Sequence, residues 1–358
     1  MNSFPIVSMR RASVRIAMIG VLLVVLWSCS SATTTPASTA PSTAAPSVLA
    51  SGAEPTASPT ASATAQPTAK PAVPRPTFFG QAGPPNAAVG ATVTIVAAGD
   101  IACDPAHNTG QPQNCDQAAT ADLIGQLNPT AVLTLGDDQY EDGTAAGFQS
   151  VFGATWGKYT SIMYPAIGNH EYLTHGATGY FDYFGVPAYY SYNLGAWHMI
   201  TLDSECSYIG GCETGSPQEK WLLADLAAHP SRCTLVYWHE PRWSSGEHGD
   251  ATQMTTIWND LVAAHVSVVL SGHNHDYERF VPLNAAGQPD PKGITEFVVG
   301  TGGKNHYGFT VAPLAGEVVR NDKSFGVIEM TLNPTSYSWK FVDAPTYTFA
   351  DSGSANCN

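Results

Sequence analysis

Five short segments of this chain carry side chains that can bind a metal ion or move a proton, and each follows a run of apolar residues. The segments are Gly99-Asp100, Gly136-Asp137 with Tyr140, Gly168-Asn169-His170, Trp238-His239 and Gly272-His273-Asn274-His275. Glycine allows a tight exit from a strand, and it precedes the polar residue in several of them. Because α/β folds place ligands at the carboxyl ends of strands, the five segments are expected to converge on one site.

The donor atoms in these segments suit a dinuclear metal site. The candidate ligands are Asp100, Asp137, Tyr140, Asn169, His239, His273 and His275. Seven donors are too many for one tetrahedral zinc ion, but they suit two ions that share one carboxylate. Mixed oxygen and nitrogen donors favour iron, manganese or zinc over calcium. A single Gly-Asp pair is usually a turn and a lone histidine is usually a core residue, so the prediction depends on all five segments together.

The elements that must position these residues alternate between strand and helix early in the chain and become hairpins later. Strands are predicted at 92–98, 131–135, 162–167, 189–194, 196–202, 234–238, 266–270, 295–299, 326–332 and 336–342. Helices are predicted at 118–127, 148–159, 217–228 and up to residue 264. Ser216 to Glu219 is a capping box with proline at the first helical position, and Asp250 with Gln253 is expected to cap the last helix. This order predicts a mixed α/β sandwich, not an open parallel sheet.

The N-terminal region is predicted to direct export and then to act as a tether. Arg10, Arg11 and Arg15 precede the apolar run 16–27, which is too short to cross a bilayer comfortably, so residues 1–29 are predicted to be a signal peptide. The sequence before and including Cys29 resembles the bacterial lipobox, which predicts a lipid-anchored protein. Ordinary cleavage nearby, giving a secreted protein, is the alternative, and a twin-arginine route also stays open.

Residues 30–90 are rich in Ala, Thr, Ser and Pro and are predicted to be a disordered linker, because they offer little apolar surface to offset the entropy of ordering. Residues 91–358 are predicted to be the catalytic domain. Six of the seven cysteines follow Cys29, and an even number in an exported protein favours three disulfides. Short spacing favours Cys103–Cys115 and Cys206–Cys212, which leaves Cys233 and Cys357.

The charge balance limits the class of partner. The formal net charge is −14 and only 12% of the residues are charged. An acidic chain lacks the basic face that a nucleic-acid polymer requires, so such a partner is excluded. An acidic protein that acts on anionic substrates needs a local source of positive charge, and two bound metal ions would supply it.

Taken in order, the five segments resemble the five blocks of the calcineurin-like metallophosphoesterases, and they look most like the purple acid phosphatase branch. The run from Gly272 to Arg279 reads Gly-His-x-His-x-Tyr-Glu-Arg, which strengthens the resemblance. It covers residues 92–345 and implies a four-layer α/β/β/α sandwich with two mixed sheets and the metals at one edge of both. Tyr277, Glu278 and Arg279 are expected to brace the metal loop.

One residue selects the branch. Most of the superfamily has a histidine ligand two residues after the first aspartate, but this chain has Ala102 there, and the branch itself usually has glycine. Tyr140 offers the missing donor, and a phenolate suits Fe(III). The alternative for Tyr140 is a buried structural role.

The resemblance also implies a set of roles. Metal 1, Fe(III), would take Asp100, Tyr140, His275 and the bridging Asp137, whereas metal 2, which would be Fe, Zn or Mn, would take Asp137, Asn169, His239 and His273. A metal-bound hydroxide would be the nucleophile. His170 is predicted to be the general acid, with phosphate positioning as its alternative. His248 is predicted to bind substrate, and its alternative is a solvated loop histidine.

The predicted function is an exported, metal-dependent phosphatase that hydrolyses small phosphomonoesters, of the acid phosphatase type. The same site could instead serve a phosphodiesterase or nucleotidase, and a non-catalytic, tethered metal-binding lipoprotein is a third reading. Membrane contact is expected only through the lipid anchor. A zinc protease is excluded because no second histidine follows His239-Glu240 at helical spacing.

Overall fold

The computed structural model describes residue 88 and residues 90–104 and 115–358. The predicted signal peptide, Cys29 and nearly all of the predicted linker lie outside these residues. All described residues belong to the unit Thr68–Asn358. Among the helices of the described part, none is both long and apolar enough to cross a bilayer.

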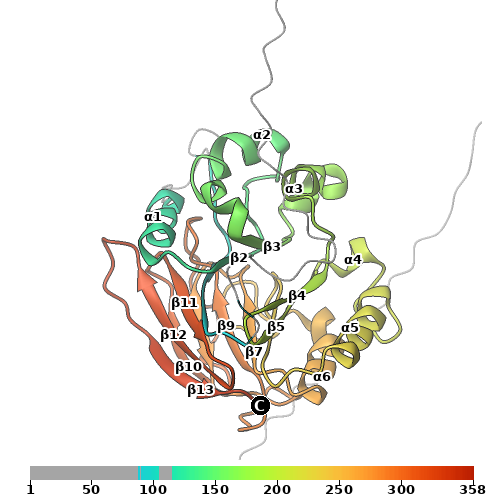
Figure 1. Cartoon of the computed structure of the whole chain (residues 1–358). Helices are drawn as coiled ribbons and strands as arrows, with labels where there is room; N and C mark the ends of the chain where they lie inside the picture. The colour runs from blue at the N-terminus through green and yellow to red at the C-terminus, as the bar shows by residue number, and fades with distance from the viewer. Residues whose placement is uncertain (1–87, 89, 105–114) are drawn as a thin grey trace, which may run out of the picture. The chain divides into compact units, whose positions relative to one another are not determined.

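Two mixed β-sheets form the framework of the described domain (Figure 1). The first sheet has the order β13-β12-β11-β1-β2-β3 and the second has the order β10-β8-β9-β7-β6-β5-β4. The strands of the first are β1 (Val93–Ala98), β2 (Ala131–Leu135), β3 (Met163–Ala166), β11 (Gly326–Leu332), β12 (Ser336–Asp343) and β13 (Ser352–Asn356). Those of the second are β4 (Tyr190–Leu194), β5 (Trp197–Thr201), β6 (Thr234–Tyr237), β7 (Val268–Ser271), β8 (Tyr277–Phe280), β9 (Thr295–Val299) and β10 (Glu317–Asn321).

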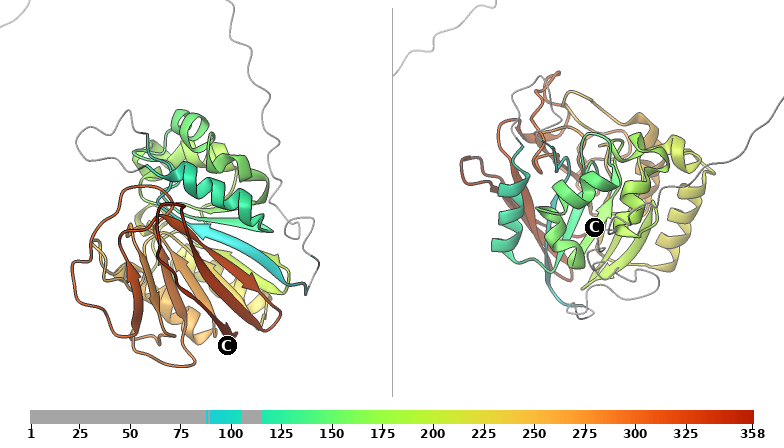
Figure 2. Two further views of the ribbon diagram at one scale, coloured as in Figure 1. Left: turned by 90° about the vertical axis from the view of Figure 1, so that its left-hand side faces the viewer. Right: turned by 90° about the horizontal axis from the view of Figure 1, so that it is seen from above.

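Helices cover the outer faces of both sheets, which gives the predicted four layers (Figure 2). The helices beside the first sheet are α1 (Gln117–Leu127), α2 (Ala145–Gly147) and α3 (Thr178–Phe184), and those beside the second are α4 (Cys206–Ile209), α5 (Pro217–Ala228) and α6 (Thr255–Ala263). The alternation of side chains along β6 shows how the layers are joined. Leu235 and Tyr237 enter the core between the sheets, whereas Val236 packs with Trp258 and Leu261 of α6.

Parallel pairing brings the functional strand ends to one edge. β1, β2 and β3 are parallel neighbours in the first sheet, and β5, β6, β7 and β9 are parallel neighbours in the second. The carboxyl ends of these strands therefore lie at the same edge of each sheet, where polar loops can meet.

Two local predictions differ from the structure. The segment 148–159 is not one helix: it forms a π-helical turn at Phe148–Phe152 and, after a break, a 3₁₀ helix at Trp156–Ile162. Thr155 has non-helical dihedral angles (φ −119°, ψ −98°), and its hydroxyl donates to the carbonyl of Phe152 at 3.2 Å. This side-chain bond competes with helix continuation.

The predicted cap at Asp250 is also wrong, because α6 begins at Thr255 after a 3₁₀ turn at Thr252–Met254, and Met254 is its cap without a side-chain bond. Asp250 instead accepts from the amide of Ser244 at 2.9 Å, and Gln253 donates to Glu240. The cap of α5 is confirmed, since Ser216 accepts from the amide of Glu219 at 3.3 Å.

The three predicted disulfides are confirmed. Cys103–Cys115 and Cys206–Cys212 close short loops, and Cys233–Cys357 joins the start of β6 to the residue after β13. The last bond spans 124 residues, so it ties the C-terminal edge strand to the second sheet.

Candidate metal centre

The structure brings all seven predicted ligands into one contiguous cluster at the shared edge of the two sheets. β1, β2 and β3 deliver Asp100, Asp137 with Tyr140, and Asn169, while β6 and β7 deliver the three histidines. Both sheets therefore contribute donors.

One half of the cluster surrounds the phenolic oxygen of Tyr140. It lies 2.8 Å from Oδ1 of Asp100, 2.8 Å from Oδ2 of Asp137 and 3.0 Å from Nε2 of His275. Nε2 of His275 is 3.2 Å from Oδ1 of Asp100, so the four donors are mutually close.

The other half surrounds Nε2 of His239. This nitrogen lies 3.3 Å from Oδ2 of Asp137, 3.1 Å from Oδ1 of Asn169 and 3.2 Å from Nδ1 of His273. Oδ2 of Asp137 is thus a member of both halves, as a bridging carboxylate would be.

These separations fit metal coordination. Metal–ligand bonds of about 2.0–2.2 Å place neighbouring donors around one ion roughly 3 Å apart. The donor–donor distances in both halves fall between 2.8 and 3.3 Å. The residues present therefore fit two metal ions, with carboxylate, phenolate, amide and imidazole donors divided between them.

The backbone is strained where it turns into the cluster. Asp100, Asp137 and His273 have φ values of 59°, 51° and 68°, in the left-handed region that non-glycine residues rarely adopt. Such strain persists only where surrounding structure holds it, and it is common at functional sites. At Gly136, a Cβ atom would lie 2.6 Å from Nδ1 of His239, so only glycine allows this approach.

Backbone carbonyls orient two of the histidines. Nδ1 of His239 faces the carbonyl of Leu135 at 2.8 Å, and Nδ1 of His275 faces the carbonyl of Asn305 at 2.5 Å. Each Nδ1 therefore donates its hydrogen, which leaves Nε2 with a lone pair that points into the cluster.

The cluster is rich in buried acid. Burial alone would raise the pKa of Asp137, but the imidazoles of His239 and His170 outweigh it and hold that pKa below its usual value. Burial, followed by the charges of Asp100 and Asp137, raises the pKa of Tyr140 well above 10.0. A bound cation would reverse the second effect, because it favours the phenolate.

Glu171 organises two of the loops without joining the ligand cluster. It is fully buried, and its carboxylate accepts from the amides of Asp137 at 3.0 Å, Gly168 at 2.9 Å and Gln139 at 3.1 Å. The loops after β2 and β3, which carry Asp137 and Asn169, are therefore held together by one side chain.

The two predicted catalytic histidines lie at the rim. Nε2 of His170 is 3.9 Å from Oδ2 of Asp137, and the side chain is 25% exposed. The ring of His248 is exposed and lies 4.5 Å from that of His273. Both are close enough to the cluster to contact a bound substrate.

Sequence reasoning missed a sixth loop, which follows β9. Its Tyr307 stacks on His275 with ring centroids 4.0 Å apart. Its Lys304 is 5% exposed, and Nζ lies 4.7 Å from the ring centroid of Tyr140. The same ammonium group forms an ion pair with Glu141. The signal was present, because Gly300 follows an apolar strand just as the other glycines do. A Cβ there would lie 2.0 Å from the carbonyl oxygen of Asn274.

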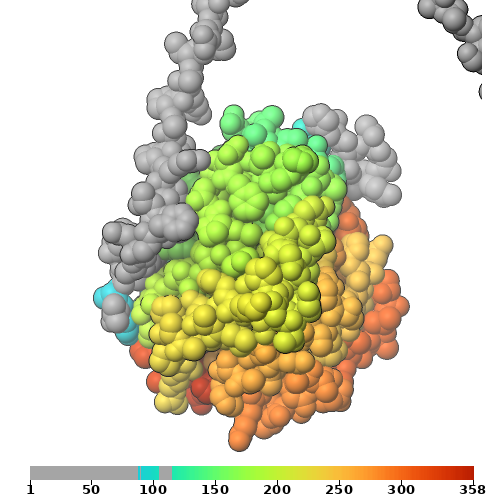
Figure 3. Space-filling model, turned by 90° about the vertical axis from the view of Figure 1, so that its right-hand side faces the viewer, coloured from blue at the N-terminus to red at the C-terminus, as the bar shows by residue number. Residues whose placement is uncertain are grey.

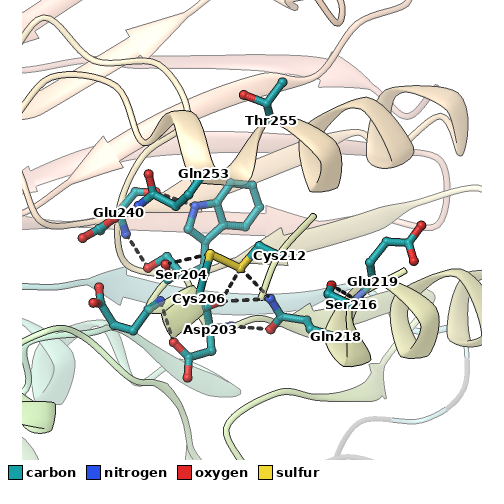
Figure 4. The surroundings of a disulfide bond; sticks show 12 residues. Asp203, Ser204, Cys206, Cys212, Ser216, Gln218, Glu219, Glu240, Gln253 and Thr255 are labelled. Carbon is teal, nitrogen blue, oxygen red and sulfur yellow. Dashed lines mark hydrogen bonds between the residues drawn. A yellow bond between two sulfur atoms is a disulfide. The ribbon is translucent and has the colours of Figure 1, made fainter. Parts of the chain in front are cut away.

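The segment just before the Cys206–Cys212 loop supports the end of β6 (Figure 4). Oγ of Ser204 accepts from the amide of Glu240 at 3.0 Å, next to His239, and Gln218 of α5 donates to the carbonyl of Asp203 at 2.9 Å. This segment thereby links α5 to the residues that carry His239.

The Tyr-Glu-Arg run after His275 braces two regions. Glu278 accepts from the amide of Ser245 at 2.8 Å and so supports the loop that carries His248. Tyr277 and Arg279 face the other way and each contact Oδ2 of Asp351 at 2.7 Å, just before β13.

Comparison with known proteins points in one direction. Residues 93–277 match the family model described as calcineurin-like phosphoesterase. Purple acid phosphatase 21 of Arabidopsis thaliana is 34% identical over 121 residues, which cover 32% of this chain and 26% of that protein. The chain thus matches only about a quarter of the length of this curated relative.

Solved structures support the fold. A purple acid phosphatase, PPD1, from yellow lupin (Lupinus luteus) seeds has a TM-score of 0.59 and 17% identity, covering 74% of this chain and 54% of that one. GAP50 of Plasmodium, described as the anchor in the inner membrane complex, has a TM-score of 0.57 and 13% identity, covering 75% and 89%.

Proposed function

Because the chain belongs to the calcineurin-like phosphoesterase family, we propose that it is a metal-dependent phosphatase that hydrolyses small phosphomonoesters in the manner of the purple acid phosphatases. The observation that carries this proposal is the position of the Tyr140 oxygen, 2.8 Å from Asp100 and Asp137 and 3.0 Å from His275. A phenol in that position supplies the donor that Ala102 cannot.

Asp100, Tyr140 and His275 would hold an Fe(III) ion, and Asn169, His239 and His273 would hold Fe, Zn or Mn, with Asp137 shared. When bound, two such ions supply positive charge to the phosphate oxygens and lower the pKa of water. The other side chains then act on the substrate. His170, whose Nδ1 faces the carbonyl of Glu141 at 2.5 Å, presents Nε2 to the leaving oxygen and would donate a proton from the charged ring.

Export is part of the proposal. Residues 1–29 would be removed as a signal peptide, with Cys29 as the lipidated N-terminus, and residues 30–90 would hold the domain away from the membrane. Three disulfides support an oxidising compartment, because reducing compartments keep most thiols free. Metabolic labelling with palmitate should mark the wild type but not Cys29→Ala. Label on both would exclude this anchor.

The test of the metal assignment is the visible spectrum and metal content of the purified full chain. We expect an absorption band from phenolate-to-Fe(III) charge transfer that disappears in Tyr140→Phe, a change that keeps the ring packed against His170 at 4.4 Å. An active, colourless, iron-free wild type would overturn the Fe(III) assignment.

Side-by-side assays with mono- and diester chromogenic substrates would decide the substrate class, and faster diester hydrolysis would favour a phosphodiesterase.

His248→Ala is expected to raise KM for a phosphomonoester by about 10-fold or more with a smaller change in kcat. A hydrogen bond to a charged phosphate contributes about 1.5–3 kcal/mol, and the ring lies beside His273 at the rim. The matched control is His265→Asn. His265 is exposed and has a φ of 58°, a backbone conformation that asparagine tolerates. Equal KM values for the two variants would assign His248 to a solvated loop.

A further inference from the structure

A second cluster of metal-capable side chains lies away from the candidate metal centre. It consists of His198 on β5, Asp225 on α5 and His229, which follows α5 directly. His198 pairs in register with Thr234 at the start of β6, whereas His239 lies five residues further along. At about 3.3 Å per residue, the two sites are separated by roughly 16 Å along the sheet.

The three side chains converge on one carboxylate. Nε2 of His198 lies 2.7 Å from Oδ2 of Asp225. Nδ1 of His229 lies 3.1 Å from Oδ1 of Asp225 and 3.0 Å from the backbone carbonyl oxygen of Asp225. One donor atom from each residue lies within 4.8 Å of the other two. Asp225 and His229 are four residues apart, so they share one face of the helix end.

Positive charge beside Asp225, either a second proton on the His198 ring or a bound cation, would satisfy both ring nitrogens of His198. Its Nδ1 faces Oδ1 of Asn193 at 2.9 Å and its Nε2 faces the Asp225 carboxylate, so both ring nitrogens face oxygen acceptors. A neutral imidazole carries one N–H only. If that hydrogen is on Nδ1, the lone pair of Nε2 faces a carboxylate unless a positive ion lies between them. A metal-bound histidine commonly donates its other N–H to an oxygen acceptor, and Oδ1 of Asn193 is such an acceptor for Nδ1.

Charging both rings instead would be costly. The rings of His198 and His229 are stacked, with centroids 4.8 Å apart and an interplanar angle of 21°. His198 is 2% exposed and Asp225 is 9% exposed, so two imidazolium charges would repel each other with little screening by water. A single cation held by both rings would avoid that repulsion.

The carboxylate is held in its ligand form. Burial would raise the pKa of Asp225, but hydrogen bonds from His198 and from Ser191, whose Oγ donates to Oδ1 at 2.6 Å, outweigh burial and lower that pKa. The lowered pKa keeps the Asp225 carboxylate ionised and available as a ligand.

One side of the cluster is open. The side chain of His229 is 45% exposed and lines a hollow of about 670 Å³ that Arg232 and Asp260 also line. The helices α5 (yellow) and α6 (orange) lie side by side in Figure 3. A metal at this point would have two imidazole nitrogens and one carboxylate from the protein, and a fourth position toward solvent. That donor set suits Zn²⁺ and does not suit Mg²⁺ or Ca²⁺.

We propose that His198, Asp225 and His229 bind a further divalent ion of the zinc class, which joins β5 to the C-terminal end of α5 and is independent of the candidate metal centre at Asp137.

The test is a comparison of zinc content between the full chain and His229→Gln. Both proteins are stripped of metal by a chelator, loaded with Zn²⁺, passed through gel filtration and analysed for zinc per chain. We expect wild type to retain one more ion than His229→Gln, and Asp225→Asn to match His229→Gln. Zinc should raise the melting temperature of wild type by roughly a few degrees more than that of His229→Gln.

The difference between the two proteins does not depend on how many ions the candidate metal centre takes. Phosphatase activity of His229→Gln should equal that of wild type, so failure of the proposed function and failure of this site are separate results.

The control is His265→Asn, which also loses a surface histidine and should keep the ion. Equal zinc in wild type and His229→Gln would overturn the site and leave the cluster as a structural hydrogen-bond network. Equal loss in His265→Asn would mean adventitious surface binding, which also overturns it.

Discussion

Replacing Asp137 with asparagine is expected to lower kcat/KM for phosphomonoester hydrolysis by at least about 10³-fold and to reduce the content of bound metal. Oδ2 of Asp137 lies 2.8 Å from the Tyr140 oxygen and 3.3 Å from Nε2 of His239, so one atom serves both halves of the cluster. A neutral amide would not bridge two cations as a carboxylate does, and under the proposed function the activation of water would depend on those cations. Steady-state kinetics and metal analysis of the same preparation measure both effects.

The matched control is Asp138→Asn. Asp138 is the next residue and is also fully buried, but it belongs to neither group of neighbouring metal-capable side chains among the described residues. The amide substitution keeps the shape of the buried side chain, whose pKa burial already raises, and leaves the bridging carboxylate in place, so we expect its effect on kcat/KM to be at least tenfold smaller. If Asp137→Asn kept its full metal content and more than a tenth of wild-type activity, the bridging role would be rejected.

Replacing Glu171 with alanine is expected to destabilise the protein by about 3 kcal/mol or more, although Glu171 is not a proposed ligand. Its carboxylate accepts from three buried backbone amides, those of Asp137, Gln139 and Gly168. Each amide left without an acceptor costs about 1–3 kcal/mol. For a domain of this size, the melting temperature should fall by roughly 6–12 °C, which differential scanning calorimetry would measure.

Glu171→Gln separates the hydrogen bonds from simple space filling. Glutamine keeps the shape and one acceptor oxygen but turns an NH₂ group toward at least one backbone amide. Its melting temperature should therefore lie between those of wild type and Glu171→Ala. A fall of less than about 2 °C in the alanine variant would show that water replaces the carboxylate at the loops after β2 and β3.

The five polar segments could be found without a structure because each consists of a local pattern, an apolar strand followed by a tight turn and a ligand-type side chain. The strands, the helix cap at Ser216 and the short disulfide loops could be predicted for the same reason, because each depends on residues close together in the sequence. Together with the resemblance to a family, these patterns sufficed for the sandwich, the three disulfides and the list of candidate ligands.

Two expectations were wrong because of local side-chain contacts: the Thr155 hydroxyl donates to the carbonyl of Phe152, and Asp250 accepts from the amide of Ser244 instead of capping α6. Other features depend on residues far apart in the chain. The placement of Tyr307 on His275, and of Lys304 beside Tyr140, follows from the meeting of the β9 and β7 ends. No spacing in the sequence encodes those contacts.

The same distinction applies to the chemistry. The types of donor residue, and hence the class of metal that we propose, follow from local sequence because side-chain chemistry belongs to each residue alone. The sharing of one Asp137 oxygen by both halves, the support of Glu171 and the His198–Asp225–His229 cluster follow from the tertiary structure. They arise from distances across two packed sheets and a helix end, which are set by long-range packing that no local pattern reports.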